Sequence, residues 1–436
     1  MKQIRNLRWW IVILLAAAIG LNYLDRQSFP VAVLEIGKSI PLTDRQYGNL
    51  QALFLLAYAL MYACGGKLID LLGTRVGYAV IILWWSAATF IQGLVHSVTG
   101  LGIARVLLGL GEGGGFPGSA KAVSEWFPPK ERSLAFGIFT AGSSLGAVVA
   151  VPLVAFIILT LNWRWAFFIT GALGFAWLAV WWILYELPGK HKLITPGERE
   201  YILSSLSTAE TVAGEVAQPR IAWVELFQRR QLWGLLLPKF FTDAAWFFLI
   251  FWLPKYLGDV RHLNIKEIGY YAWIPYAFSG VGCLAGGWLS GFLIRRRFTI
   301  DRSRKITLAM GAALMPASLL ITTSPLNLAI VLFSMALFGH QFWSTILQTL
   351  AADIFPSTSV GSVAGLMGAA GSVGAMFFNY LVGILLSHYA AYPVVFAATG
   401  LLYPLSFIII WLMVRKIEPL NGRGYGSGEA ERAALT

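Results

Sequence analysis

Twelve stretches of about 20 or more predominantly apolar residues limit most strongly how this chain can fold. Each is long enough to cross the hydrocarbon core of a bilayer as a helix, which takes about 20 residues. With 57% hydrophobic and 12% charged residues, the chain has too much apolar surface for a water-soluble globule. We therefore predict an all-α polytopic membrane protein with spans at residues 9–34, 46–66, 76–95, 98–124, 133–159, 163–185, 231–256, 267–293, 305–322, 326–352, 359–387 and 392–414.

The basic residues indicate how the spans are oriented. The net charge of +12 comes largely from clusters between the spans, and alternate loops carry few lysines or arginines. Because cytoplasmic loops are enriched in these residues, Lys2, Arg5 and Arg8 at one end and Arg415 and Lys416 at the other place both termini in the cytoplasm. The positive net charge is therefore explained by the orientation of the chain in the membrane. For this reason we expect no nucleic acid partner.

A long polar segment divides the spans into two groups of six. We predict an N-terminal six-helix bundle at 1–186, a cytoplasmic linker at 187–228, a C-terminal six-helix bundle at 229–416 and a disordered cytoplasmic tail at 417–436. Within the linker, the Pro-Gly-Glu-Arg-Glu stretch that begins at Pro196 is typical of a short amphipathic helix at the membrane surface.

The two halves are related in sequence. Seven residue pairs match at a constant offset of 228, and the Gly65-Gly66 pair matches Gly286-Gly287 at an offset of 221. Two parallel six-helix repeats that hold a ligand between them near mid-membrane are a transporter architecture. We therefore predict bundles related by pseudo-two-fold symmetry. The matches at 228 are Phe127/Phe355, Pro128/Pro356, Gly137/Gly365, Ala141/Ala369, Ser144/Ser372, Gly146/Gly374 and Ala147/Ala375.

Four charged residues lie inside predicted spans of the first half. Arg105 and Glu112 are seven residues apart, so they lie two turns apart on nearly the same helix face. Asp25 and Arg26 are adjacent and point about 100° apart, so one can face a cavity while the other meets a neighbouring helix. A charge at this depth is costly unless it has a partner or water. A functional site and a structural ion pair both remain open for Arg105 and Glu112.

The charges also indicate the sign of a ligand. Both arginines stay protonated, whereas Asp25 and Glu112 can each take up a proton when they are desolvated. With both acids neutral, the site is cationic and prefers an anion, so proton uptake and anion binding favour each other. This linkage is the basis of proton/anion symport. We expect these four side chains to share one water-filled chamber, with Tyr23 and Tyr58 presenting rings and hydroxyls to it.

The second half offers weaker candidates. His340 follows Glu112 by the repeat offset of 228, and it could either titrate or be held by a backbone group or Gln341. Lys239 and Asp243 are spaced for an intrahelical ion pair. Several neutral polar residues at membrane depth could bind ligand hydroxyls or join helices. Those we consider for binding are Ser143, Gln341, Gln348 and Ser372.

A glycine-rich segment at the cytoplasmic end of the second span suggests a conformational role and not substrate binding. Gly66 and Gly73 permit close helix approach, and Asp70 can pair with a basic residue such as Arg75 or Arg132. We interpret these five residues as a conformational latch.

These motifs resemble known families. The Gly-x-x-x-Asp-x-x-Gly-x-Arg pattern from Gly66 to Arg75 is similar to the signature loop of the major facilitator superfamily, although Leu71 replaces its usual basic residue. Asn22-Tyr-Leu-Asp-Arg26, Arg105-x-x-x-Gly-x-Gly-Glu112 and Glu125-Trp-Phe-Pro resemble the anion:cation symporter family. Asn162-Trp-Arg-Trp and Phe338-Gly-His-Gln341 are most similar to its bacterial hexuronate branch.

The resemblance implies specific roles. Asp25 and Glu112 match the proton-coupling acids of the family, and Arg26 and Arg105 match its cavity arginines. Tyr23, Tyr58 and Ser143 match positions that line the sugar-acid pocket. Gln348 and Ser372 stand where a galactonate-type pattern has tryptophan and asparagine, which favours galacturonate or glucuronate over galactonate.

The expected protein is therefore a monomeric, proton-coupled importer of a hexuronate by alternating access, in a bacterial plasma membrane or Gram-negative inner membrane. Alternatives are import of another organic anion, such as the hexonate galactonate, or organophosphate/phosphate exchange, which the buried acids disfavour. The sequence shows no His-Glu-x-x-His metal pair, and its five histidines are dispersed. We thus predict no enzyme activity, no cofactor and no metal, with a sugar-acid anion, protons and membrane lipid as partners.

Overall fold

A computed structural model of the protein describes residues 3–215, 223–389 and 391–418. These residues form helices and no strand apart from one isolated bridge between Ile4 and Ile194. The first half comprises α1 (Leu7–Ser39), α2 (Asp44–Leu72), α3 (Thr74–Gln92), α4 (Val98–Glu112), α5 (Gly115–Trp126), α6 (Pro129–Thr160) and α7 (Trp163–Leu184).

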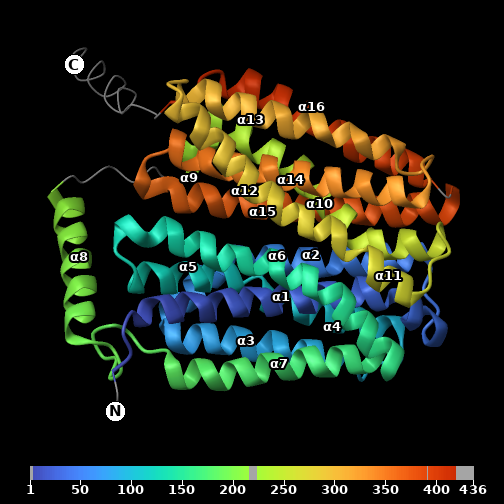
Figure 1. Ribbon diagram of the computed structural model, residues 1–436, viewed down its shortest axis with the longest axis horizontal. Helices are drawn as coiled ribbons and strands as arrows, with labels where there is room; N and C mark the ends of the chain where they lie inside the picture. Colours follow the sequence, from blue (N-terminus) through green and yellow to red (C-terminus); the bar gives the residue numbers. More distant parts are fainter. Residues whose placement is uncertain (1–2, 216–222, 390, 419–436) are drawn as a thin grey trace, which may run out of the picture.

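The second half begins after two connecting helices, α8 (Pro196–Glu215) and α9 (Trp223–Gln228). It comprises α10 (Arg230–Asp259), α11 (Ile265–Tyr271), α12 (Trp273–Arg295), α13 (Ile300–Leu314), the 3₁₀ helix η1 (Met315–Leu320), α14 (Leu326–Ile354), α15 (Ser357–Tyr389) and α16 (Tyr392–Val414). Figure 1 shows the two halves as two layers of nearly parallel helices.

Ten helical segments among the described residues are long and apolar enough to cross a membrane. The other two predicted spans are each built from two shorter pieces. The fourth consists of α4 and α5, which are separated at Gly113 and Gly114, and the ninth consists of α13 and η1. Pro316 lies in the first turn of η1, where its missing N–H interrupts the regular α-helical hydrogen bonds. The prediction of a twelve-span helical fold is confirmed.

The internal repeat is visible in how the helices end and pack. Phe127 ends α5 and Phe355 ends α14 with the same extended backbone, and each is followed by a proline that leads into the next span. Gly65 of α2 packs against Gly114, whereas Gly286 of α12 packs against Phe342. These two contacts are related by the same offsets of 221 and 228. The parallel repeat is therefore structural as well as sequential.

The helices also show where the two bundles touch. α1 begins and α16 ends at one end of the molecule, which we call the terminal end; the other is the distal end (Figure 1). At the distal end, Lys255 of α10 forms an ion pair of 2.8 Å with Asp44 of α2. A Cβ on Gly48 of α2 would lie 2.7 Å from the carbonyl oxygen of Asn379 in α15, so these helices are in backbone contact. The bundles are thus held together at the distal end.

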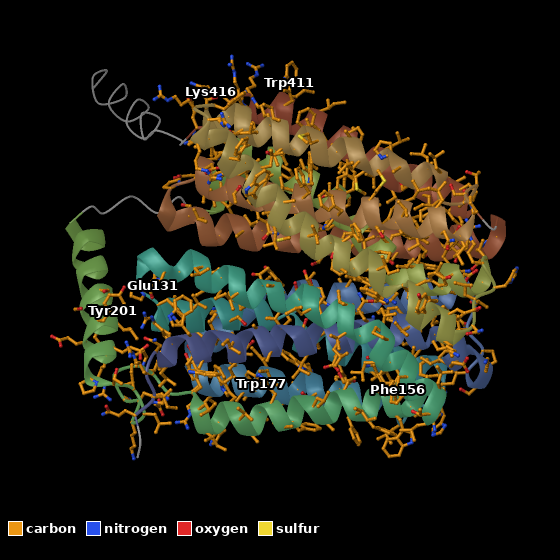
Figure 2. All side chains as sticks on the ribbon, in the orientation of Figure 1. Glu131, Phe156, Trp177, Tyr201, Trp411 and Lys416 are labelled. Atoms are coloured by element: carbon orange, nitrogen blue, oxygen red, sulfur yellow. The ribbon has the colours of Figure 1, made fainter. Side chains whose placement is uncertain are left out.

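The linker is attached to the first bundle at the terminal end. The Glu198 carboxylate in α8 accepts a hydrogen bond of 2.9 Å from the Leu7 backbone and pairs with Arg8 at 2.9 Å. The hydroxyl of Tyr201 donates to Glu131 of α6 at 3.3 Å, and both residues are labelled in Figure 2. A helix that begins at Pro196 is confirmed, and its position at the membrane surface stays a prediction.

We propose that the predicted boundaries at 1–186, 187–228, 229–416 and 417–436 divide the chain into its functional units. Most of the proposed tail, residues 419–436, lies outside the described residues, as does the linker stretch 216–222. Large apolar side chains such as Phe156 and Trp411 are 63% and 58% exposed on the outer faces (Figure 2). Such side chains suit contact with lipid.

Candidate functional site

The glycines of α4 bring α2 against the charged residues of α4. A Cβ on Gly109 would lie 2.4 Å from the carbonyl oxygen of Phe54, and one on Gly113 would lie 2.5 Å from that of Tyr58. Real Cβ atoms do not approach so closely, so any larger residue would push the helices apart. The glycine-rich sequence therefore sets the aromatic side chains of α2 beside Arg105 and Glu112.

Arg26 and Glu112 form a fully buried ion pair. The Arg26 Nε donates to Glu112 Oε2 at 2.9 Å, and the two side chains are 1% and 0% exposed. A second guanidinium nitrogen donates to Asn22 Oδ1 at 3.1 Å. Glu112 Oε1 has no hydrogen-bond partner. Only one carboxylate oxygen of Glu112 is therefore bonded to Arg26, and the other has no hydrogen-bond partner.

Aromatic rings enclose the Arg26 guanidinium. Its Cζ lies 4.7 Å from the ring centroid of Tyr23 and 4.7 Å from that of Tyr58. The cation is therefore stabilised by the electron-rich faces of two rings. Ser143 of α6 lies beside Tyr23, and its hydroxyl donates to the Thr140 carbonyl at 2.7 Å. The structure thus brings Tyr23 and Tyr58 together around Arg26, with Ser143 beside Tyr23.

Arg105 is the second cationic group of the site. Its guanidinium is fully buried, 4.3 Å from the Phe54 ring centroid and 4.8 Å from that of Phe29. One terminal nitrogen donates to the Gln51 amide oxygen, whereas Nε and the other terminal nitrogen have no partner. Buried donors without acceptors are costly. This guanidinium is consequently suited to receive a planar, bidentate anion such as a carboxylate.

Asp25 makes no hydrogen bond or ion pair with these groups, although it interacts electrostatically with Glu112, so the expected common chamber is seen only in part. Its carboxyl group is fully buried beside Thr89 of α3 and Thr170 of α7. Neither carboxylate oxygen has a hydrogen-bond partner. The physical reason is the helix itself, since adjacent residues point about 100° apart. Arg26 faces α4, so Asp25 faces the interior of the first bundle.

The second half places His340 in an aromatic environment. The imidazole is 2% exposed and stacks on Trp246, with ring centroids 4.3 Å apart and an interplanar angle of 13°. Its Nδ1 is hydrogen-bonded to the Tyr403 hydroxyl, rather than to a backbone group or Gln341. The predicted pair in α10 is confirmed, because Lys239 Nζ lies 2.9 Å from Asp243 Oδ1.

The remaining second-half candidates have local hydrogen bonds. The Gln348 amide donates to Ser344 at 3.2 Å, the Ser372 hydroxyl donates to the Gly368 carbonyl at 2.9 Å, and the carbonyl of Gln341 accepts from Thr345 at 2.8 Å. No hydrogen bond among the described residues joins them to Arg26 or Arg105. Their binding roles stay predictions.

The predicted latch residues make contacts within the first bundle. Asp70 pairs with Lys121 of α5 at 2.9 Å, instead of with either expected arginine. Arg75 pairs with Glu186, and Arg132 donates at 3.0 Å to the carbonyls of Phe127 and Ser124. Gly73 has a φ of 75°, which glycine adopts without strain in the turn between α2 and α3. Gly66 has open space beside it.

Sequence reasoning missed Gln51, Asn22 and Phe54, which all contact the arginines. For Gln51 a signal was available, because it is a polar residue inside the apolar stretch of the second span and one turn from Tyr47.

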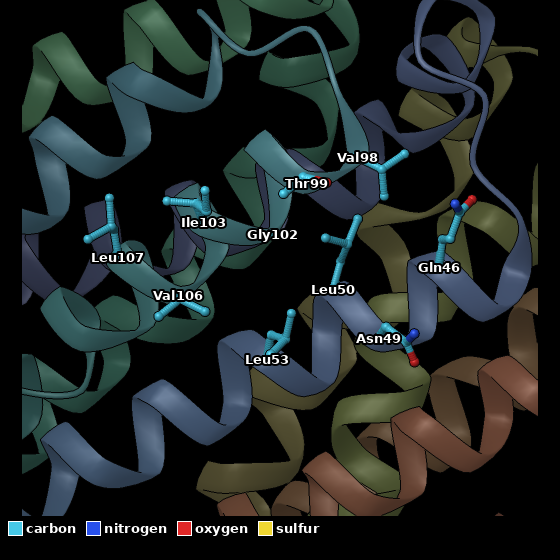
Figure 3. A pocket seen from close by; sticks show the side chains of 10 residues that line it. All are labelled: Gln46, Asn49, Leu50, Leu53, Val98, Thr99, Gly102, Ile103, Val106 and Leu107. Carbon is cyan, nitrogen blue, oxygen red and sulfur yellow. The ribbon is translucent and has the colours of Figure 1, made fainter.

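The groove shown in Figure 3 is separate from these residues. It encloses about 460 Å³ between α2 and α4 and contains none of the predicted site residues. Its rim includes Leu53 and Ile103, which are 40% and 59% exposed, so it opens to the outer surface of the first bundle. The lining consists of Gln46, Asn49, Leu50, Leu53, Val98, Thr99, Gly102, Ile103, Val106 and Leu107.

Comparison with known proteins places this fold and site in one class. The profile of the Major Facilitator Superfamily matches residues 15–346 and 298–436. The chain therefore belongs to this superfamily of membrane transporters, and it is not an enzyme. The predicted resemblance is confirmed.

Individual relatives are similar along most of the chain. A hexuronate transporter of Escherichia coli strain K12 is 34% identical over 419 residues, which cover 95% of this chain and 96% of the relative. A galacturonate transporter of Dickeya chrysanthemi is 36% identical over 74% of this chain and 94% of its own length. Among solved structures, a bacterial homologue of the human lysosomal transporter Spinster has a TM-score of 0.74 at 20% identity, covering 95% of this chain and 98% of its own. That structure supports the fold alone.

Proposed function

We propose that the protein imports a sugar-acid anion, galacturonate or glucuronate, together with protons. The observation that carries this proposal is the buried Arg105 guanidinium, which keeps donors without partners next to the Arg26–Glu112 pair. The hexuronate and galacturonate transporters among its relatives support the same class of substrate. A carboxylate at Arg105 would pair with a free donor and would bind bidentately by also taking the terminal nitrogen that now donates to Gln51.

The ion pair supplies a route to proton coupling. While Glu112 is ionised, its charge cancels that of Arg26 and leaves Arg105 as the uncompensated cation. Protonation of Glu112 removes this compensation, so Arg26 becomes available to an anion. Proton binding and anion binding then strengthen each other by the same factor, as linkage requires. Asp25 is a second proton acceptor in this proposal, because an ionised carboxylate without partners is costly at this depth.

The contact between the bundles at the distal end supports a proposal of alternating access. With both termini in the cytoplasm, as the basic residues predict, the distal end faces outward and the ion pair between Asp44 and Lys255 closes it. The site would then be reached from the cytoplasm in this conformation. Import requires a second conformation in which the distal contacts open and the terminal end closes.

The proposal is tested with the full-length protein in liposomes that enclose a pH-sensitive dye. An inward proton gradient should drive accumulation of labelled galacturonate, and added galacturonate should acidify the interior of the liposomes. Galactose serves as the neutral control and should do neither. Uptake without acidification would contradict symport, and a response to galactonate but not to hexuronates would favour the hexonate alternative.

A further inference from the structure

One face of α2 connects the anion-binding arginine to the contact between the bundles. Asp44, Tyr47 and Gln51 are spaced by three and four residues, so they share one side of the helix. We call these three residues the α2 contact face. At its inner end, the Gln51 amide oxygen accepts from Arg105, and the Gln51 Nε2 donates to the Tyr47 hydroxyl at 2.9 Å. Gln51 thus uses one end of its amide for the arginine and the other for the tyrosine.

The outer part of the same face reaches the other bundle. The Tyr47 hydroxyl donates to the Phe251 carbonyl of α10 at 2.6 Å, and Asp44 pairs with Lys255 one turn further along α10. Tyr47 and Gln51 are both fully buried. A continuous series of hydrogen bonds therefore runs from Arg105, through α2, to the backbone of α10.

Pro254 lies in α10 close to the contact with Tyr47. Proline has no N–H, so the carbonyl four residues earlier, that of Ile250, lacks its helical donor. That carbonyl accepts instead from the Tyr276 hydroxyl at 2.8 Å. The adjacent Phe251 carbonyl is the one that accepts from Tyr47. The irregularity in α10 thus lies one residue from the contact between the bundles, and the Tyr276 hydroxyl takes the place of the missing helical donor at Ile250.

We propose that Gln51 and Tyr47 are positioning residues that couple anion binding at Arg105 to opening of the distal end. Without ligand, Gln51 is the neutral acceptor that occupies Arg105. A carboxylate carries a full negative charge and can accept two parallel hydrogen bonds from a guanidinium, whereas the neutral Gln51 oxygen accepts one. An arriving carboxylate therefore draws the guanidinium away from Gln51.

The loss of that contact is transmitted along the face. Once its amide oxygen is released, Gln51 no longer has a fixed orientation and its Nε2 is no longer aimed at the Tyr47 hydroxyl. The bond between Tyr47 and Phe251 then loses its support, and the contact between α2 and α10 weakens. Ligand binding thereby makes it easier for the distal end to open. The identity of the ligand rests on the proposed function, but the hydrogen-bond series does not.

A purely structural role for Tyr47 predicts a different result. Its ring stacks on Phe29 with centroids 5.7 Å apart and meets the edge of Trp252 at 4.8 Å. Tyr47→Phe keeps both ring contacts and removes only the hydroxyl. If packing alone holds the distal end closed, this variant behaves as the parent does.

The experiment measures the separation of the bundles at the distal end. Spin labels are attached to cysteines introduced at Arg45 and Ser387, both exposed and in opposite bundles. A Cβ on Gly383, one turn from Ser387, would lie 3.4 Å from the Arg45 Cα, so the two labels start close together. Cys64 and Cys283 are replaced by alanine, and distances are recorded by pulsed electron paramagnetic resonance with and without galacturonate.

We expect Tyr47→Phe and Gln51→Leu to raise the separated population about fivefold without ligand, which corresponds to about 1 kcal/mol. We also expect galacturonate to increase that population in the parent and to have little further effect in either variant. The matched control is Tyr78→Phe, because Tyr78 is equally buried but hydrogen-bonds Ser119 at 2.8 Å within the first bundle. Tyr78→Phe should match the parent.

The proposal is overturned if ligand-free Tyr47→Phe has the distance distribution of the parent. It is also overturned if galacturonate separates the labels equally in both. Binding is measured separately, as a shift in melting temperature on addition of galacturonate. A parent that is not stabilised by any hexuronate contradicts the proposed substrate, and the ligand-free comparison still tests the role of Gln51 and Tyr47.

Discussion

The two bundles share one fold but carry different chemistry. In the first bundle, Arg105 and Glu112 are buried in α4 as charged groups. At the repeat offset of 228, the second bundle has Phe333 and His340 in their places. Phe333 lies in an aromatic cluster, with ring centroids 5.6 Å from Tyr256 and 5.4 Å from Phe396. At these two positions the duplicated scaffold therefore carries charged side chains in one half and aromatic ones in the other.

This difference suggests how the halves divide the work of binding. A guanidinium recognises a carboxylate, whereas a flat ring such as Trp246, stacked on His340, offers an apolar face that suits the ring of a sugar. We infer that the first bundle binds the acid group and couples protons, and that the second bundle contacts the remainder of the ligand. The predictions below test this division in order of decreasing effect.

Glu112→Gln should have the largest effect, because it removes the proton acceptor next to Arg26 while it keeps the shape of the side chain. We expect proton-driven accumulation of galacturonate to be abolished and counterflow exchange to survive. Both are measured with labelled substrate in liposomes. Glu35→Gln, a change at a distal-end carboxylate paired with Lys38, serves as the control. Loss of exchange as well, in a folded protein, would assign Glu112 to substrate contact or structure.

Arg105→Lys should weaken binding by about 10- to 100-fold, since a point charge cannot replace the two parallel hydrogen bonds of a guanidinium. The measurement is the galacturonate concentration that gives half-maximal thermal stabilisation. The exposed Arg302→Lys should leave that concentration unchanged. An unaltered affinity in Arg105→Lys would remove this residue from the site.

His340→Gln should have a smaller effect, about threefold on affinity, because it removes a stacking partner of Trp246 but no charge that binds the acid group. The pH dependence of uptake should keep its shape. Measuring initial rates between pH 5 and 8, where histidine titrates, checks this expectation. A flattened pH profile would show that His340 takes part in proton coupling, so the division between the halves would fail.

Asp70→Asn should have the smallest effect on stability. Asp70 and Lys121 have side chains that are 61% and 42% exposed, and exposed ion pairs contribute about 0–1 kcal/mol. We expect the melting temperature of the ligand-free protein to change by no more than a few degrees. A transport rate that falls far more than stability does would indicate that the latch acts in another conformation.

Much of the fold could be predicted from local sequence, although its breaks could not. The hydropathy of each span and the offset of 228 predicted twelve helices in two related bundles. They did not predict that α4 and α5 would separate at Gly113 or that α13 would pass into η1. Such breaks depend on how neighbouring helices pack. The hydropathy of successive residues contains no information about that packing.

The site was predictable only in part for a related reason. Helical spacing indicated that Asp25 and Arg26 diverge, but it could not show which of them faces α4. The polarity of Gln51 is visible in the sequence, but its partner is not, because Arg105 is 54 residues away in the chain and adjacent in space.

The sequence by itself determined the membrane environment, the twofold repeat and the identities of the buried charges, because hydrophobicity, periodicity and charge are properties of residues along the chain. Only the tertiary structure decided the partners of those charges. It pairs Arg26 with Glu112, leaves Asp25 among the hydroxyls of α3 and α7, and connects Arg105 to α10 through Gln51 and Tyr47. Partners are set by the packing of helices distant in sequence, where glycines allow backbones to touch and side chains meet across the contact.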